Sequence, residues 1–215
     1  MIKRLALMFL ISGALVVAQA DNVSLVSSAT TTTNSTASPT QNIDTNPLWA
    51  GPLAGSSWVS FASTGNPSDS GFVAVPNGTA VTFTDTFSLS GTIQSAYLNV
   101  LADDTASVWV NGTELMAANL TGPYPVCAAT GIGCLATTEG MFTNSQLAPY
   151  LQDGTNTVQF TVYQEGGGPY GLDYSGAVTT TAADPPNDPV RTPEPSSVLL
   201  LGVGFSGLAL LKLRR

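Results

Sequence analysis

The chain has 215 residues, a length typical of one domain with appendages, and a formal net charge of -8 at pH 7. Residues 21–190 hold thirteen of the fourteen acids but no Lys or Arg, and the whole chain lacks histidine. A nucleic-acid partner is excluded, because such a protein needs basic side chains to displace the counterions of phosphates. The missing residues also remove Ser-His and Cys-His catalytic pairs and Schiff-base chemistry, and the compatible small partners are cations.

The first part of the chain has the features of a secretion signal. Lys3 and Arg4 form a positive start, an apolar run follows, and Ala18 and Ala20 give the small-x-small pattern of a cleavage site. We therefore expect residues 1–20 to be a helical signal peptide that passes through the Sec translocon and is removed. A permanent N-terminal anchor is the alternative, although the apolar run is short for a membrane span.

The next segment, residues 21–45, is rich in Ser, Thr and Asn and shows no apolar period. Segments of this composition bury too little apolar surface to offset the entropy of ordering the chain. We predict that this segment is a disordered Ser/Thr-rich leader. Residues 181–191 are rich in Pro and polar residues, and they are predicted to be a linker.

Residues 46–180 contain repeated runs in which apolar and polar residues alternate. In one of them, Val158, Phe160 and Val162 fall on one side of an extended chain and polar residues fall on the other. Enrichment in Val, Thr and aromatic residues, with turn signals at short spacing, favours an all-β antiparallel sandwich. Only residues 145–151 have a helical pattern.

The pair Asn111-Gly112 is the sequence that a two-residue type I′ hairpin requires. We therefore expect a strand, a tight turn and a second strand around it. Together with an Asp153-Gly154 turn, the strand that follows it and a glycine-rich return, this hairpin resembles the galactose-binding-like jelly roll. The resemblance covers the middle domain, and it implies a two-sheet β-sandwich.

Cys127 and Cys134 are the two cysteines of the chain and lie in a loop rich in Gly and Pro. Export to an oxidising compartment favours a disulfide between them. Zinc binding is the alternative, but two thiols without histidine are too few for a structural zinc site.

Asp103 and Asp104 are the candidate metal ligands. Carboxylates are the hard oxygen ligands that calcium prefers, and the resemblance to the jelly roll implies a structural calcium ion. No other cofactor is expected. Neighbouring residues of a strand face opposite sides, so this pair is not expected to act as the two catalytic acids of a glycosidase.

Tyr124, Tyr170 and Tyr174 are the candidate ligand-binding residues, since they lie in loops rich in Gly and Pro. A flat aromatic ring covers the apolar face of a sugar, while nearby polar groups bind its hydroxyls. The alternative is that these rings pack against the sheet. Trp58 and Trp109 lie within strand-like runs and are predicted to belong to the core.

The C-terminal segment, residues 192–215, has a Pro-Glu-Pro triplet, an apolar run and a basic end. The apolar run as a helix falls somewhat short of the hydrocarbon thickness of a bilayer, and a snorkelling lysine makes up part of the difference. Basic residues remain on the cytoplasmic side, so we expect a transmembrane helix with the domain outside. The residues that define this segment are Pro193, Glu194, Pro195, Lys212, Arg214 and Arg215.

This arrangement resembles the PEP-CTERM sorting signal. The resemblance implies recognition by an exosortase, a membrane-embedded cysteine-type protease or transpeptidase of Gram-negative bacteria that make extracellular polysaccharide. A plain C-terminal anchor is the alternative. The expected destination is the cell surface or the extracellular matrix.

These features predict a non-enzymatic protein that binds carbohydrate or has a structural role within an exopolysaccharide or biofilm. A secreted glycan-active hydrolase is the alternative from another class. A calcium-dependent adhesin is a third possibility, and it predicts a melting temperature that falls on chelation.

Overall fold

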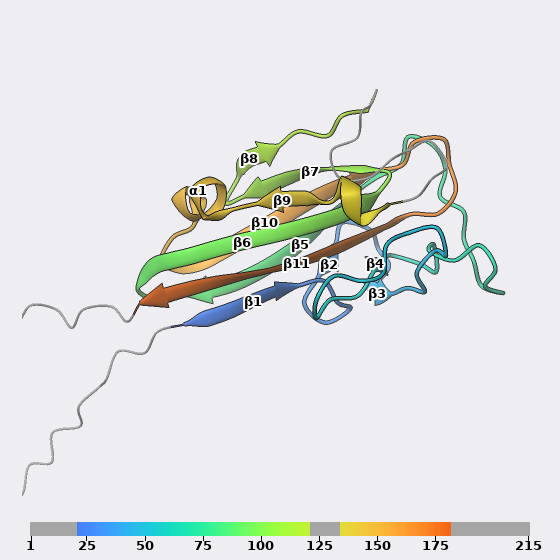
Figure 1. The fold of residues 1–215 in the computed structure, drawn as a ribbon. Coiled ribbons are helices and arrows are strands. Elements are labelled where there is room, and N and C mark those ends of the chain that lie inside the picture. Colours follow the sequence, from blue (N-terminus) through green and yellow to red (C-terminus); the bar gives the residue numbers. More distant parts are fainter. Residues whose placement is uncertain (1–20, 121–133, 182–215) are drawn as a thin grey trace, which may run out of the picture. The chain divides into compact units, whose positions relative to one another are not determined.

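The computed structural model describes residues 21–120 and 134–181, which fold mainly as β-strands (Figure 1). The helical elements are α1 (Asn144–Leu147) and the 3-10 turns η1 (Ala136–Thr138) and η2 (Ala148–Tyr150), so the helix predicted at 145–151 corresponds to α1 and η2. In chain order, the strands are β1 (Asn22–Val26), β2 (Thr33–Asn34), β3 (Gln41–Asn42), β4 (Val59–Ser60), β5 (Ala80–Leu89), β6 (Thr92–Asp103), β7 (Thr105–Val110), β8 (Thr113–Met116), β9 (Gly140–Phe142), β10 (Gly154–Tyr163) and β11 (Gly171–Thr181).

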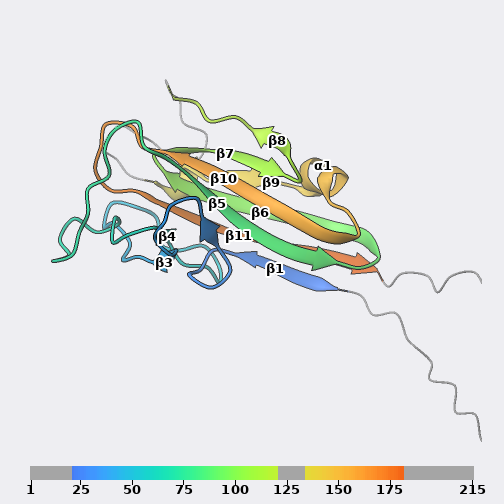
Figure 2. The ribbon, with the colours of Figure 1, turned by 180° about the vertical axis from the view of Figure 1, so that it is seen from behind.

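The strands in the described part of the chain form two sheets that pack face to face (Figures 1 and 2). A six-stranded sheet has the order β3-β4-β11-β6-β9, with β1 also paired to β11. A five-stranded sheet has the order β2-β5-β10-β7-β8. All pairings between these described strands are antiparallel, so the predicted all-β antiparallel sandwich is confirmed.

The core lies between the two sheets and follows the alternation seen in the sequence. Val158, Phe160 and Val162 of β10 are buried, whereas Thr157 and the other polar residues between them are only half-buried. The fully buried ring of Phe160 is worth roughly 3–5 kcal/mol by comparison with Phe-to-Ala changes in other cores. The face of β10 that carries the polar residues is therefore left for contacts outside the core.

The hairpin predicted at Asn111-Gly112 is confirmed. Asn111 has a φ of 49° and Gly112 a φ of 80°, and Val110 pairs with Thr113 across the turn. Positive φ at both central residues is the requirement of a type I′ turn. The Asn111 side chain also donates to Tyr150 O at 2.8 Å, which joins the turn between β7 and β8 to the end of η2.

The prediction of a disordered leader at residues 21–45 is wrong, because this segment contains β1, β2 and β3. Leu25 of β1 is buried in the core, and the Ser27 hydroxyl donates to Asp173 Oδ1 at 2.8 Å. The composition of the segment gives no sign of these contacts, since they join residues far apart in the sequence. The sandwich therefore starts near residue 21 and not at residue 46.

The first and last described strands, β1 and β11, lie side by side, so the two ends of the described sandwich are close together. In the register of β1 with β11, Asn22 faces Thr179. Just before β1, Asp21 N donates to Thr180 Oγ1 and Thr180 N donates to Asp21 O, both at 3.0 Å. The first strand is thus held along the last.

The predicted signal peptide, most of the linker and the predicted C-terminal transmembrane helix lie outside the described residues. In the portion that is described, no helix is long and apolar enough to cross a membrane. The signal helix and the membrane span remain predictions from the sequence.

Candidate functional site

The structure places two of the predicted sugar-binding tyrosines inside the sandwich. Tyr170 is 0% exposed and Tyr174 is 1% exposed, and burial raises the pKa of both phenols. The Tyr170 hydroxyl donates to Val162 O at 2.9 Å, and the Tyr174 hydroxyl donates to Asp85 Oδ2 at 3.1 Å. The prediction is wrong for these two, because Tyr174 occupies an inward position of β11 and Tyr170 comes just before that strand. Tyr124 lies outside the described residues.

Asp103 and Asp104, which we call the aspartate pair, lie where β6 passes into β7. They are 7% and 6% exposed, and the peptide bond between them is cis. Their side chains form a hydrogen bond with each other. The expectation that they face opposite sides is therefore wrong, since strand alternation does not extend past the end of β6.

Burial raises the pKa of Asp103 to about 9, and the negative charge of Asp104 adds to the shift. Burial also raises the pKa of Asp104, but hydrogen bonds from Asp103 and from the Glu165 N–H, the latter at 2.5 Å, oppose this rise. At neutral pH Asp103 therefore keeps its proton. Asp104 N donates to Tyr163 O at 3.1 Å, which joins the pair to the end of β10.

Calcium binding at the aspartate pair stays a prediction. Within the two described segments, no group of three or more His, Cys, Asp or Glu side chains is placed to hold a metal ion. Calcium takes about six to eight oxygen ligands, so the pair would need backbone carbonyls and water to complete its shell.

Cys134 is buried against Trp49, Trp58 and Leu101 on the outer side of the six-stranded sheet. Its sulfur does not belong to a free thiol. Cys127 lies outside the described residues, so the disulfide between the two remains a prediction. Trp58 is fully buried, which confirms its predicted place in the interior.

An open groove of about 410 Å³ lies on the outer face of the five-stranded sheet and runs over β5, β10, β7 and β8. Because side chains alternate along a strand, this face carries the polar partners of the buried core residues. The groove is lined by Thr82, Ser107, Trp109, Glu114, Ala117, Ala118, Leu120, Gln159, Thr161 and Tyr163.

Trp109 lies in this groove and not in the core, so the prediction for this residue is wrong. Val108 and Val110 are buried, whereas Trp109 is half-buried and its Nε1 donates to Ser107 Oγ at 3.2 Å. The alternation of this run already contained the signal. Since Val108 and Val110 point inward, the residue between them points outward.

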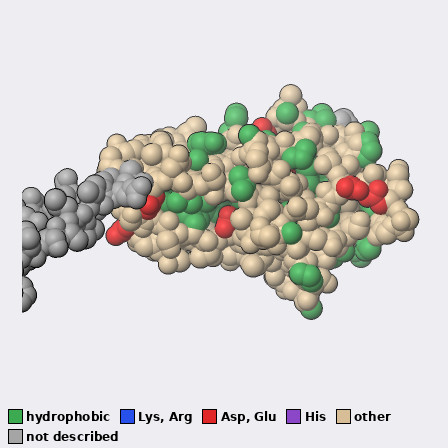
Figure 3. Space-filling model, turned by 90° about the horizontal axis from the view of Figure 1, so that it is seen from below, with side chains coloured by type: hydrophobic (Ala, Val, Ile, Leu, Met, Phe, Trp, Pro, Cys, Tyr) green, Lys and Arg blue, Asp and Glu red, His purple; other side chains and the backbone are tan. Residues whose placement is uncertain are grey.

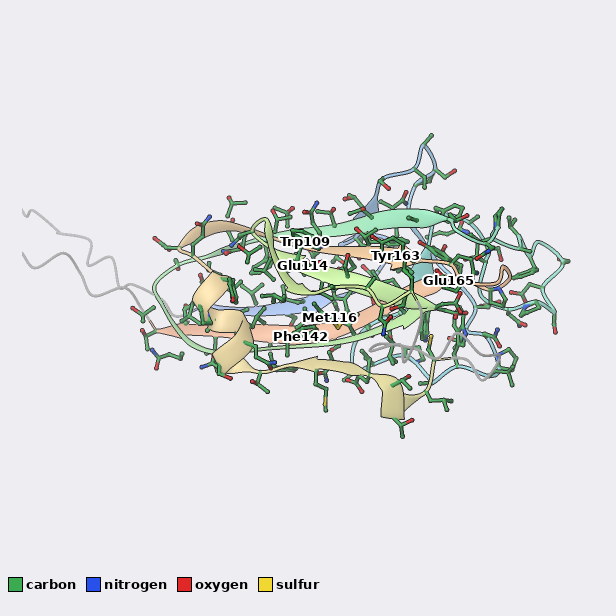
Figure 4. All side chains as sticks on the ribbon, turned by 90° about the horizontal axis from the view of Figure 1, so that it is seen from above. Trp109, Glu114, Met116, Phe142, Tyr163 and Glu165 are labelled. Carbon is green, nitrogen blue, oxygen red and sulfur yellow. The ribbon has the colours of Figure 1, made fainter. Side chains whose placement is uncertain are left out.

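Strand register places the groove residues in rows across the sheet. Trp109 of β7 faces Gln159 of β10 on one side and Glu114 of β8 on the other. Tyr163 lies four residues beyond Gln159, which is roughly 13 Å along the strand. Figure 4 shows Trp109 beside Glu114 and Tyr163 displaced toward Glu165. The two aromatic rings therefore mark two separate positions along one groove.

Hydroxyl groups fill the space between these two positions. Thr161 faces Thr82 and Ser107 in the register of the sheet, and the Oγ1 atoms of Thr82 and Thr161 lie 2.9 Å apart. Hydroxyls both donate and accept hydrogen bonds, so this floor can match the hydroxyls of a ligand in several orientations.

A second hollow of about 280 Å³ adjoins the groove at β8. Glu114 lines both hollows, and Tyr150, which is 39% exposed, lines the second. Gln146 and Ser145 of α1 add an amide and a hydroxyl. Glu114 thus lies between two hollows, each of which has an aromatic ring that is at least partly exposed.

Aromatic rings among hydroxyls, amides and a single carboxylate suit the recognition of a sugar chain. Rings cover the apolar faces of sugars, and the polar side chains hydrogen-bond their hydroxyls. The sequence-based prediction missed Trp109, Tyr163 and Glu114, because it looked for binding aromatics in loops and assigned strand aromatics to the core.

Comparison with known families identifies one part of the chain. Residues 191–215 match the PEP-CTERM protein-sorting motif, so the resemblance noted at Pro193, Glu194 and Pro195 is confirmed. The motif indicates an exported protein that an exosortase sorts. No protein of curated function matches the chain in sequence.

Several solved structures are similar to the sandwich at low sequence identity. An α-L-rhamnosidase from Streptomyces avermitilis, complexed with L-rhamnose, is 21% identical with a TM-score of 0.43; the match covers 69% of this chain but only 14% of that one. A family 35 carbohydrate binding module from Clostridium thermocellum is 18% identical with a TM-score of 0.39, covering 72% of this chain and 97% of the module. A second family 35 module, from an environmental isolate, is 15% identical with a TM-score of 0.34, covering 72% and 98%.

Proposed function

We propose that this exported chain is a non-enzymatic polysaccharide-binding protein of the cell surface or extracellular matrix. The groove on the outer face of the five-stranded sheet is its binding site, with Trp109 and Tyr163 as the platforms for sugar rings. The observation that supports this proposal is the placement of both rings on one open face, with hydroxyl and amide side chains between them. An open groove admits the middle of a long chain and does not require a chain end.

The exosortase motif supports a destination outside the cytoplasm, where polysaccharide is available. After sorting, the sandwich would hold the protein within an extracellular polysaccharide layer. The Sec route, the membrane span and the place in a biofilm are parts of this proposal.

The charged residues of the groove favour binding over hydrolysis. Glycoside hydrolysis uses two carboxylic acids that face the scissile bond. Of the described residues that line the groove, Glu114 is the one that carries a carboxylate. Saturable binding without release of new reducing ends would support the binding function, and such release would favour the secreted hydrolase.

The direct test is affinity electrophoresis of the full-length protein, in mild detergent, through gels that contain soluble polysaccharides. Trp109→Ala removes one platform and is expected to weaken binding by about 2 kcal/mol, roughly thirtyfold in Kd. Tyr163→Ala is expected to act in the same direction.

Tyr97→Ala is the matched control, because Tyr97 is a 49% exposed aromatic residue of β6 in the other sheet. Circular dichroism checks that each variant is folded. Unchanged retardation of both folded groove variants would disprove the assignment of the site.

A further inference from the structure

The groove contains a carboxylate that the proposed function does not require. Glu114 is exposed and lies at the junction of the two hollows. In the register of β7 with β8 it directly faces Trp109. Directly opposed side chains of an antiparallel pair have Cβ atoms roughly 5 Å apart, so one sugar ring on Trp109 also reaches Glu114.

The surroundings of Glu114 contain no positive charge to balance it. Residues 21–190 have no Lys or Arg, so no basic side chain of the described residues can neutralise this carboxylate. Figure 3, which views the molecule from below and does not label the groove, shows acidic groups at a few separate positions and no basic group among the coloured atoms of that face. A groove in such a surface attracts cations and repels anions.

The opposite end of the groove is also acidic. Tyr163 is followed two residues later by half-buried Glu165, and the Glu165 N–H donates to Asp104 Oδ2. One carboxylate therefore lies beside Trp109, and another lies past Tyr163 (Figure 4). A uronate, sulfate or phosphate in this position would find no basic partner.

A sugar that covers Glu114 must replace the water that now solvates it. Covering a carboxylate without a strong partner is costly, and an ammonium group is the partner that compensates best. The same ammonium also interacts favourably with the face of Trp109. The Glu114 carboxylate and the Trp109 ring therefore both favour a ligand that carries an ammonium group.

We infer that the groove selects polysaccharides with free amino groups, that is, partly or fully deacetylated hexosamine chains, through an ammonium bound between Glu114 and Trp109. This inference rests on the proposed function and adds the ligand class. It explains why a carboxylate stands beside the central aromatic ring in a domain without bases. Binding is thus specific for positive charge at one sugar position and does not depend on the net charge of the protein alone.

The test is isothermal titration calorimetry of the full-length protein in mild detergent with three oligosaccharides of equal length. These are a glucosamine oligomer, its N-acetylated form and a uronic acid oligomer. The glucosamine oligomer is expected to bind at least about tenfold more tightly than the acetylated form, since charge-assisted hydrogen bonds are about twice as strong as neutral ones. The uronic acid oligomer is expected not to bind.

Two variants with the same change of charge separate the site from general attraction. Glu114→Gln is expected to weaken glucosamine binding about tenfold and to weaken binding of the acetylated form less, so that the preference for the amino form is lost. Asp153→Asn, at an exposed position in the turn before β10, removes the same charge outside the groove and is expected to change neither.

Each other outcome has a definite meaning. Equal losses in the two variants would show attraction by net charge and overturn the inference. Equal binding of the amino and acetylated oligomers, or binding of the uronic acid oligomer, would overturn the inference but leave the polysaccharide-binding function intact. Failure of every oligosaccharide and of neutral glucans to bind would overturn both.

Discussion

Replacing Asp103 with Asn should remove most of the pH dependence of stability that the aspartate pair produces. The folded-state pKa of Asp103 is about 9, against an ordinary value of 3.8, because the side chain is buried beside Asp104. A raised folded pKa means that folding favours the protonated acid. This contribution is complete below about pH 4 and is lost as the pH rises toward 9.

The size of the effect follows from linkage. One proton bound in the folded state but not in the unfolded state changes the free energy of unfolding by about 1.4 kcal/mol per pH unit, or about 4 kcal/mol between pH 5 and pH 8. Asn is neutral at both pH values and keeps an N–H that can donate to Asp104. Asp103→Asn should therefore lose this slope and be more stable than the wild type at pH 8.

Urea unfolding followed by tryptophan fluorescence at several pH values, with a chelator present, measures the difference. Asp153→Asn serves as the exposed control and should keep the wild-type slope. Other acids with raised pKa values, such as Asp85 and Asp173, contribute slopes of the same sign in all three proteins, so only the difference between them is diagnostic. Parallel pH profiles for the wild type and Asp103→Asn would refute the reasoning.

Three further predictions follow from the interior and the loops. Tyr174→Phe should lower the free energy of unfolding by about 1–3 kcal/mol in urea titrations, because buried Asp85 loses a donor, while glycan binding stays unchanged. If the aspartate pair binds calcium, chelation should lower the Tm of the wild type but not of a variant with both aspartates replaced by Asn; equal shifts would point to another site. The disulfide of Cys127 with Cys134 should leave no titratable thiol in denaturant without reductant, and its reduction should cost about 2.5 kcal/mol of stability; two reactive thiols would disprove it.

The parts of the fold that the sequence predicts well depend on neighbouring residues. Alternation alone identifies β10 and the side of it that is buried, because the side chains of a strand repeat every two residues. The Asn111-Gly112 turn was predictable for a similar reason, since its backbone requirement is met by two adjacent residues.

The parts that were missed depend on distant partners. Leu25 belongs to the core because β1 pairs with β11, and no property of the segment around Leu25 announces that strand. Polar segments of this kind are ordered by backbone pairing and by hydrogen bonds such as that of Ser27 with Asp173. The composition of a segment reveals neither its backbone pairing nor its hydrogen bonds with distant residues.

The candidate site was missed for a different reason. The alternation of residues along β7 indicated which side chains point outward, but the prediction did not use it. Trp109 alternates with two inward valines, which places it on the outer face, but its position within a strand-like run had suggested the core. Tyr174 shows the opposite case, because nearby glycines suggested a loop although the residue lies within β11, where it pairs with Val100 of β6. In both cases the observed strand predicts the side of the sheet better than residue type does.

The pairing of β1 with β11 has a consequence for export. Among the described strands, β11 is the one to which β1 is paired, and these two are the first and last strands of the sandwich. If the predicted signal peptide sends the chain across the membrane from its N-terminus onward, β1 emerges early and β11 emerges late. The β1 edge cannot close while β11 is still behind the membrane, so the sandwich is completed only when the sequence just ahead of the sorting motif has emerged. Topology thereby delays completion of the fold until translocation is almost finished.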